Sequence, residues 1–166
     1  MKHAQSIWPV MLLLLAACPA DGRKEDAAPA KDKPVLEYAA PFRQIILSAD
    51  LRLSDIEELP EYDNPVAAVP SKMTKMEKTA QVAAAEADEL LHFIRESGFE
   101  GLKDAYGAKP EERSYPHRIL VRDGATSKEV ICRSSPAAEA CPEIFVKVEK
   151  SIIAFASKAD EPKTGE

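Results

Sequence analysis

Residues 115–133 read YPHRILVRDGATSKEVICR, and this stretch decides the fold. Two runs rich in aliphatic residues flank a short loop that contains Asp123-Gly124, a dipeptide typical of β-hairpin turns. Because side chains alternate along a strand, Ile119 and Val121 share one face of the first run. Val130 and Cys132 share one face of the second. The stretch therefore predicts a β-hairpin.

A helix is predicted directly after the hairpin. Pro142 suits the first turn of a helix, because the N–H that proline lacks would have no partner within the helix there. Beyond it, Phe145, Val148, Ile152 and Phe155 recur at spacings of three and four residues, which is the apolar stripe of an amphipathic helix. We expect this C-terminal helix to pack on the sheet.

A long helix is predicted before the hairpin, from Thr74 to Gly98. Thr74 and Glu77 have the spacing of a capping box, in which both side chains bond backbone N–H groups at a helix start. Gly98 supplies a C-terminal cap, which gives a helix of about 22 residues. Its early half is rich in alanine, so we expect that half to lie close against another element, in preference to forming a groove for a partner. The apolar positions behind this prediction are Met76, Ala80, Ala83, Ala87, Leu90 and Ile94.

Residues 42–53 fit two periodicities. A strand would place Ile45, Leu47, Ala49, Leu51 and Leu53 on one face, whereas a helix would align Phe42, Ile45, Ile46, Ala49 and Leu53. We favour the strand. Residues 54–59 then predict a helical turn that Pro60 stops, and residues 61–70 predict a loop because Asn64-Pro65 and Pro70 interrupt it.

Together these elements predict an α+β fold, in which a small antiparallel sheet that includes the β-hairpin carries the long helix and the C-terminal helix. We assign this fold to a single domain of residues 41–158. Residues 18–40 contain few large apolar side chains, so we expect a flexible tether there. Residues 159–166 are polar, and we expect a disordered tail.

The N-terminus resembles the signal peptide of a bacterial lipoprotein, over residues 1–17. Its apolar run, residues 10–17, is far shorter than the roughly 20 residues that cross a bilayer. The sequence Leu15-Ala16-Ala17-Cys18 then resembles a lipobox, which implies that Cys18 carries the lipid and becomes the new N-terminus. An ordinary signal peptide is the alternative. We expect a protein lipid-anchored to a membrane of the bacterial cell envelope, facing the periplasm or the exterior.

The charge balance argues against a nucleic-acid partner. The chain has 22 basic and 28 acidic residues, a formal net charge of −6. Binding to phosphates needs lysines and arginines clustered on one face, and no such cluster is evident. The membrane, through the lipid, and a second protein are the partners that we expect.

Two cysteines remain once Cys18 carries a lipid. Cys132 and Cys141 form an even pair in an exported chain, where disulfides form and persist. A structural disulfide that joins the exit of the hairpin to the start of the last helix is therefore expected. A redox or metal-binding pair is the weaker alternative, because the chain has no Cys-x-x-Cys motif and its histidines lie far from the pair in sequence.

The sequence offers little catalytic chemistry. His92 and His117 have no metal-ligand spacing, so we predict no metal site and no cofactor. Asp55, Glu57, Glu58, Glu61 and Asp63 form an acidic run that lacks the spacing of a calcium loop, and we expect it to be a solvated face. No nucleophile elbow or phosphate-binding glycine loop is present, and we predict that the protein is not an enzyme.

One resemblance concerns the C-terminal half. Residues 87–102, residues 115–124 and residues 142–155 resemble the helix, hairpin and helix of the emfourin family, small bacterial inhibitors of thermolysin-like metalloproteases. The chain departs from that family by an insertion at residues 54–73, the cysteine pair and the lipid anchor, and it lacks a glycine-rich N-terminal segment. We therefore assign no inhibitory residues.

These observations predict a membrane-anchored envelope lipoprotein with a non-catalytic, protein-binding domain. The resemblance implies a protease inhibitor as one version of this function. The alternative is a structural or accessory subunit of an envelope complex. An apolar patch left exposed on the domain would favour docking in such a complex.

Overall fold

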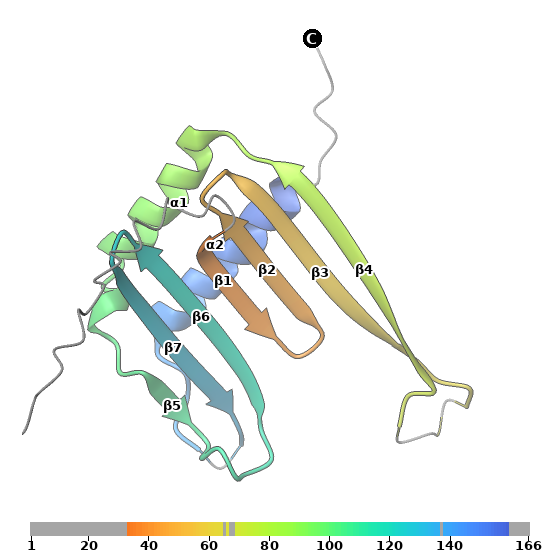
Figure 1. Ribbon diagram of the computed structural model, residues 1–166. Coiled ribbons are helices and arrows are strands. Elements are labelled where there is room, and N and C mark those ends of the chain that lie inside the picture. The colour runs from red at the N-terminus through yellow and green to blue at the C-terminus, as the bar shows by residue number, and fades with distance from the viewer. Residues whose placement is uncertain (1–32, 65, 67–68, 137, 160–166) are drawn as a thin grey trace, which may run out of the picture.

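The computed structural model describes residues 33–64, 66, 69–136 and 138–159, and shows a sheet with two helices on one face (Figure 1). The seven strands follow the order β4-β3-β2-β1-β6-β7-β5. All neighbouring strands are antiparallel except β5 and β7, which are parallel. The predicted α+β class is confirmed. The sheet is larger than predicted, because the strands β1, β4 and β5 were not foreseen. It is mixed because β5 runs parallel to β7. The elements are β1 (Pro34–Ala40), β2 (Arg43–Ser48), β3 (Arg52–Glu61), β4 (Lys72–Gln81), α1 (Ala84–Glu96), the 3₁₀ turn η1 (Phe99–Gly101), β5 (Ala105–Gly107), β6 (Tyr115–Asp123), β7 (Thr126–Ser134) and α2 (Glu143–Ala159).

The predicted hairpin and last helix are confirmed. β6 and β7 pair across the Asp123-Gly124 turn, with Ile119 opposite Val130. α2 begins one residue after Pro142 and buries Phe145, Val148 and Ile152. Phe155, expected on the same stripe, is only partly buried.

The prediction of a tether over residues 18–40 is wrong for its last part. β1 lies at the centre of the sheet, between β2 and β6. Leu36 and Tyr38 alternate along it and are almost completely buried. A strand with a neighbouring strand on each side is held by its backbone hydrogen bonds, so two large inward side chains are enough to keep it in the sheet. Residues 18–32 of the predicted tether, Cys18 among them, and the signal segment lie outside the described residues. The predicted tail of residues 159–166 is wrong for Ala159, which belongs to α2, and its other residues lie outside the described part of the chain.

The strand interpretation of residues 42–53 is confirmed in type, but the chain turns within the segment. β2 ends at Ser48 and β3 begins at Arg52, so Ile45, Leu47 and Leu53 share the buried face from two antiparallel strands. The helical turn predicted for residues 54–59 is wrong, because these residues continue β3. The loop predicted for residues 61–70 lies between β3 and β4, although Glu61 itself still belongs to β3.

The long helix is also partly wrong. Residues Thr74 and Glu77 belong to β4, and the helix starts only at Ala84, with Ala83 as a cap that makes no side-chain hydrogen bond. The capping-box pattern is local, whereas β3 offers a full row of backbone partners to β4, and this pairing prevails. The later part of the predicted stripe is right, because Ala87, Leu90 and Ile94 are the buried residues of α1. Gly98, with φ of 82°, follows the helix in the left-handed conformation expected of a cap residue.

The core lies between the sheet and the two helices. Phe99 and Phe145 are its largest fully buried side chains, and strands β1, β2, β3, β6 and β7 all contribute to it. No helix of the described residues covers the opposite face of the sheet (Figure 1).

Candidate functional site

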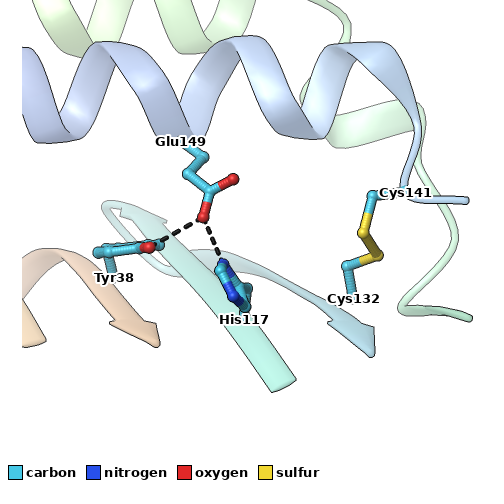
Figure 2. The surroundings of a disulfide bond; sticks show 5 residues. All are labelled: Tyr38, His117, Cys132, Cys141 and Glu149. Atoms are coloured by element: carbon cyan, nitrogen blue, oxygen red, sulfur yellow. Dashed lines mark hydrogen bonds and ion pairs between the residues drawn. A yellow bond between two sulfur atoms is a disulfide. The ribbon is translucent and has the colours of Figure 1, made fainter. Parts of the chain in front are cut away.

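The predicted disulfide is present. Cys132 in β7 and Cys141, just before α2, are bonded, with their Cα atoms 5.8 Å apart (Figure 2). Cys132 is fully buried in the core. The bond therefore joins the exit of the hairpin to the start of the last helix.

A polar cluster lies near the disulfide, where α2 crosses the sheet (Figure 2). One carboxylate oxygen of Glu149 accepts a hydrogen bond from the hydroxyl of Tyr38, at 2.8 Å. The same oxygen lies 2.5 Å from Nδ1 of His117. The three residues come from α2, β1 and β6, so the cluster ties one helix to the two central strands.

Electrostatics in this cluster favour a charged Glu149. Burial alone would raise the pKa of its carboxyl group, but hydrogen bonds from His117 and Tyr38 outweigh burial, and the pKa of Glu149 is lowered. The pKa of Tyr38 is raised, first by burial and then by its hydrogen bond to Glu149. Tyr38 therefore remains a neutral hydrogen-bond donor and Glu149 a charged acceptor. This arrangement suits a structural role, in which the hydrogen bonds hold α2 to the sheet.

The two candidate histidines do not form a site. His117 is engaged by Glu149, and its ring also lies edge-on to Tyr38 with ring centroids 6.3 Å apart. His92 is exposed on α1. Within the described ranges, no group of three or more histidine, cysteine, aspartate or glutamate side chains could hold a metal ion.

The expectation of a solvated acidic face is wrong for Asp55. Its side chain is almost fully buried and accepts two hydrogen bonds from Arg43, at 3.0 and 2.6 Å. Hydrogen bonding to Asp55 is the largest cause of the raised pKa of Arg43. Asp55 thus holds β3 to β2, and only the later members of the acidic run extend toward solvent.

Those later members lie on a projecting ribbon that we call the β3–β4 arm, residues 57–76. The Arg43–Glu57 pair is the last between β2 and β3, whereas β3 and β4 stay paired as far as Glu61 and Lys72. Beyond Glu57 the ribbon is therefore two strands wide. Figure 1 shows it extending away from the body, past the turn between β1 and β2.

The arm gathers exposed apolar side chains. Nine large apolar side chains are exposed in the described part of the chain, and six of them belong to the arm. Val66 and Val69, in the loop at its tip, are 85% and 75% exposed. The six are Leu59, Tyr62, Val66, Val69, Met73 and Met76.

Polar contacts within the arm hold its shape. The backbone N–H of Ser71 donates to the carbonyl of Glu61, at 2.9 Å, and the Ser71 hydroxyl donates to Asp63, also at 2.9 Å. Thr74 donates to the carboxylate of Glu61. The sequence pattern of this region predicts a helix start and a loop, so the arm was not predicted.

No helix in the described residues is long and apolar enough to cross a membrane. Comparison with models of protein families and with curated proteins finds no match to this chain.

Proposed function

We propose that this protein is a lipid-anchored protein of the bacterial cell envelope whose domain binds another protein through the β3–β4 arm and catalyses no reaction. The observation that carries this proposal is the concentration of exposed apolar side chains on the arm. Single exposed apolar residues are ordinary on a soluble domain, whereas several on one projecting element mark an interaction surface. The strand register places Leu59 and Met76 on one face of the arm and Met73 on the other, so both faces can contact a partner.

The construction of the arm supports this role. A two-stranded ribbon is only marginally stable in water on its own, because it has no third strand or helix to cover it. The core of this domain leaves these apolar side chains exposed. Five of them lie beyond the last pair with β2, and Met76 lies level with that pair, opposite Glu57. Burial of each against a partner contributes on the order of 1 kcal/mol.

Attachment to the membrane rests on the sequence around Cys18, which lies outside the described residues. The apolar run and the Leu-Ala-Ala-Cys sequence support lipidation at that position. Stable anchoring needs more than one acyl chain, and a diacylglycerol on Cys18 supplies two.

Two classes of partner fit this proposal. The resemblance in the C-terminal half supports a thermolysin-like metalloprotease, which the domain would inhibit. The exposed arm favours a lasting envelope complex, because surfaces that form permanent complexes are more apolar than those that form transient ones. We therefore place the accessory-subunit version first.

The test is co-purification from membranes with the tagged full chain. The arm variant carries Val66→Ser, Val69→Ser and Met73→Ser, and the control carries Phe93→Ser on α1. All these side chains are exposed, so each change should alter stability by less than about 0.5 kcal/mol. A partner that wild type and control retain, and the arm variant loses, supports the proposal. Equal recovery by all three proteins contradicts it.

A further inference from the structure

A second surface lies on the sheet face that carries no helix, at the end where β1 turns into β2. Ala39, Arg118 and Ile131 form one row across β1, β6 and β7. Their neighbours along the strands, such as Tyr38 and Cys132, are buried under the helices, so the row faces the other side. A cavity of about 530 Å³ lies over this row, and we call it the open-face pocket. It includes no residue of the β3–β4 arm.

Aromatic side chains form its walls. Phe42 and Tyr115 are 54% and 56% exposed, and Pro41 and Pro116 lie beside them. Phe42 has φ of 67°, a conformation that bulky residues rarely adopt and that costs on the order of 1 kcal/mol. The N–H of Glu58 donates to the Phe42 carbonyl at 2.8 Å and so helps to hold this turn. The turn therefore presents an aromatic ring at the pocket instead of the glycine that its backbone would favour.

One arginine at the pocket has no counter-charge among the residues that the structure describes. Arg118, which also lines the cavity, is engaged by Glu37 and Glu129, at 2.9 Å each. Arg133 is half-buried, and its side chain makes no ion pair or hydrogen bond with any residue that the structure describes. Its backbone is fixed, because its carbonyl accepts a hydrogen bond from the N–H of Ala108 at 2.9 Å.

We propose that the open-face pocket binds an acidic peptide segment in which an aspartate or glutamate adjoins an aromatic residue. The carboxylate pairs with the planar guanidinium of Arg133, which can donate two parallel hydrogen bonds to it. The neighbouring aromatic ring packs between Phe42 and Tyr115, since paired aromatic rings attract beyond simple burial. Charge complementarity selects an anionic peptide, because no carboxylate in the described part of the chain pairs with Arg133.

The probe is a fluorescein-labelled peptide, Phe-Glu-Phe, and its binding to the full chain is followed by fluorescence anisotropy. The matched probe is Phe-Gln-Phe, which keeps the rings and loses the side-chain charge of the glutamate. Both peptides are amidated at the C-terminus, so that the glutamate is the only carboxylate of the peptide chain. We expect saturable binding of the first peptide, about tenfold weaker for the second. Arg133→Gln should weaken binding of Phe-Glu-Phe by about the same factor, whereas Arg95→Gln, which removes the same charge from α1, should leave it unchanged.

A second variant separates the aromatic contact from folding. Phe42→Gly removes the ring but suits the positive φ, so the turn should form without strain. We expect it to weaken binding of Phe-Glu-Phe severalfold while the unfolding midpoint is kept. The proposal is overturned if Phe-Glu-Phe fails to bind up to about 5 mM. It is also overturned if Phe-Gln-Phe binds equally, or if Arg133→Gln and Arg95→Gln have equal effects.

Discussion

Reduction of the Cys132–Cys141 bond should destabilise the domain by a predictable amount. The two cysteines are nine residues apart in sequence, so the bond closes a loop of about ten residues in the unfolded chain. In the chain-entropy model, closing such a loop removes about 9 cal/mol/K from the unfolded ensemble, or about 2.7 kcal/mol at 25 °C. Both reduced thiols fit where the sulfur atoms already lie, and a free buried cysteine behaves as a small apolar residue. The loss should therefore arise mainly in the unfolded state.

The assay is urea unfolding of the chain from residue 18 onward, with and without dithiothreitol. Circular dichroism is the suitable probe, because the only tryptophan, Trp8, belongs to the predicted signal segment. With a slope of about 1.5 to 2.5 kcal/mol per molar urea, the midpoint should fall by about 1 to 2 M. The slope should rise slightly, since the reduced unfolded chain exposes more surface. An unchanged midpoint would refute the reasoning. The matched control is Cys132→Ala with Cys141→Ala, in which dithiothreitol should have no effect.

Three further outcomes are expected. Glu149→Ala should cost about 1 to 3 kcal/mol of unfolding free energy, because the buried Tyr38 hydroxyl loses its acceptor. The pKa of Glu149 is lowered in the fold, so wild type should keep its full gain in unfolding free energy over Glu149→Ala above the ordinary carboxyl pKa of 4.5. This gain should shrink as the pH falls below 4.5, and urea unfolding across pH 3 to 7 measures it. An advantage that grows toward low pH would contradict it. Cys18→Ser should release the protein from membranes on fractionation, and unchanged membrane association would remove the anchor from the account. If the partner is a metalloprotease, the domain should slow a thermolysin-like enzyme saturably while staying intact, and cleavage without inhibition would leave only the envelope-complex version.

The elements predicted correctly from the sequence are those whose signals are local. The β6–β7 hairpin has a turn dipeptide between two apolar runs, and α2 has four large apolar residues at helical spacing. The disulfide followed from the cysteine count and the expected compartment, and the structure adds that it fixes the start of α2 to the sheet.

The predictions are wrong where contacts with residues distant in sequence determine the local structure. Leu36 and Tyr38 look too few to build a strand, but β1 lies between β2 and β6, which supply both rows of hydrogen bonds. Thr74 and Glu77 fit a capping box, yet the chain there pairs with β3. Glu149 contacts Tyr38 and His117, which are 111 and 32 positions away in sequence, and no local pattern reveals such contacts.

The arm was not predicted as a binding surface for a similar reason. Val66, Val69, Met73 and Met76 are apolar residues beside a loop, and sequence alone cannot tell whether the core covers them. One signal was present in the sequence, because this region overlaps residues 54–73, the segment that would be an insertion if the expected resemblance to the emfourin family holds. A segment of this kind, with apolar residues that follow no clear core periodicity, is a candidate binding element.

The central claim, that the arm contacts a protein partner, is tested most directly by site-specific photo-crosslinking in cells. A photoreactive phenylalanine analogue is placed at Met73 on the arm or at Phe93 on α1, two side chains that are each 39% exposed. The account predicts a discrete crosslinked species from position 73, absent from position 93, that disappears when Val66→Ser and Val69→Ser are added. Crosslinking of equal yield from both positions, or none from position 73, would contradict it.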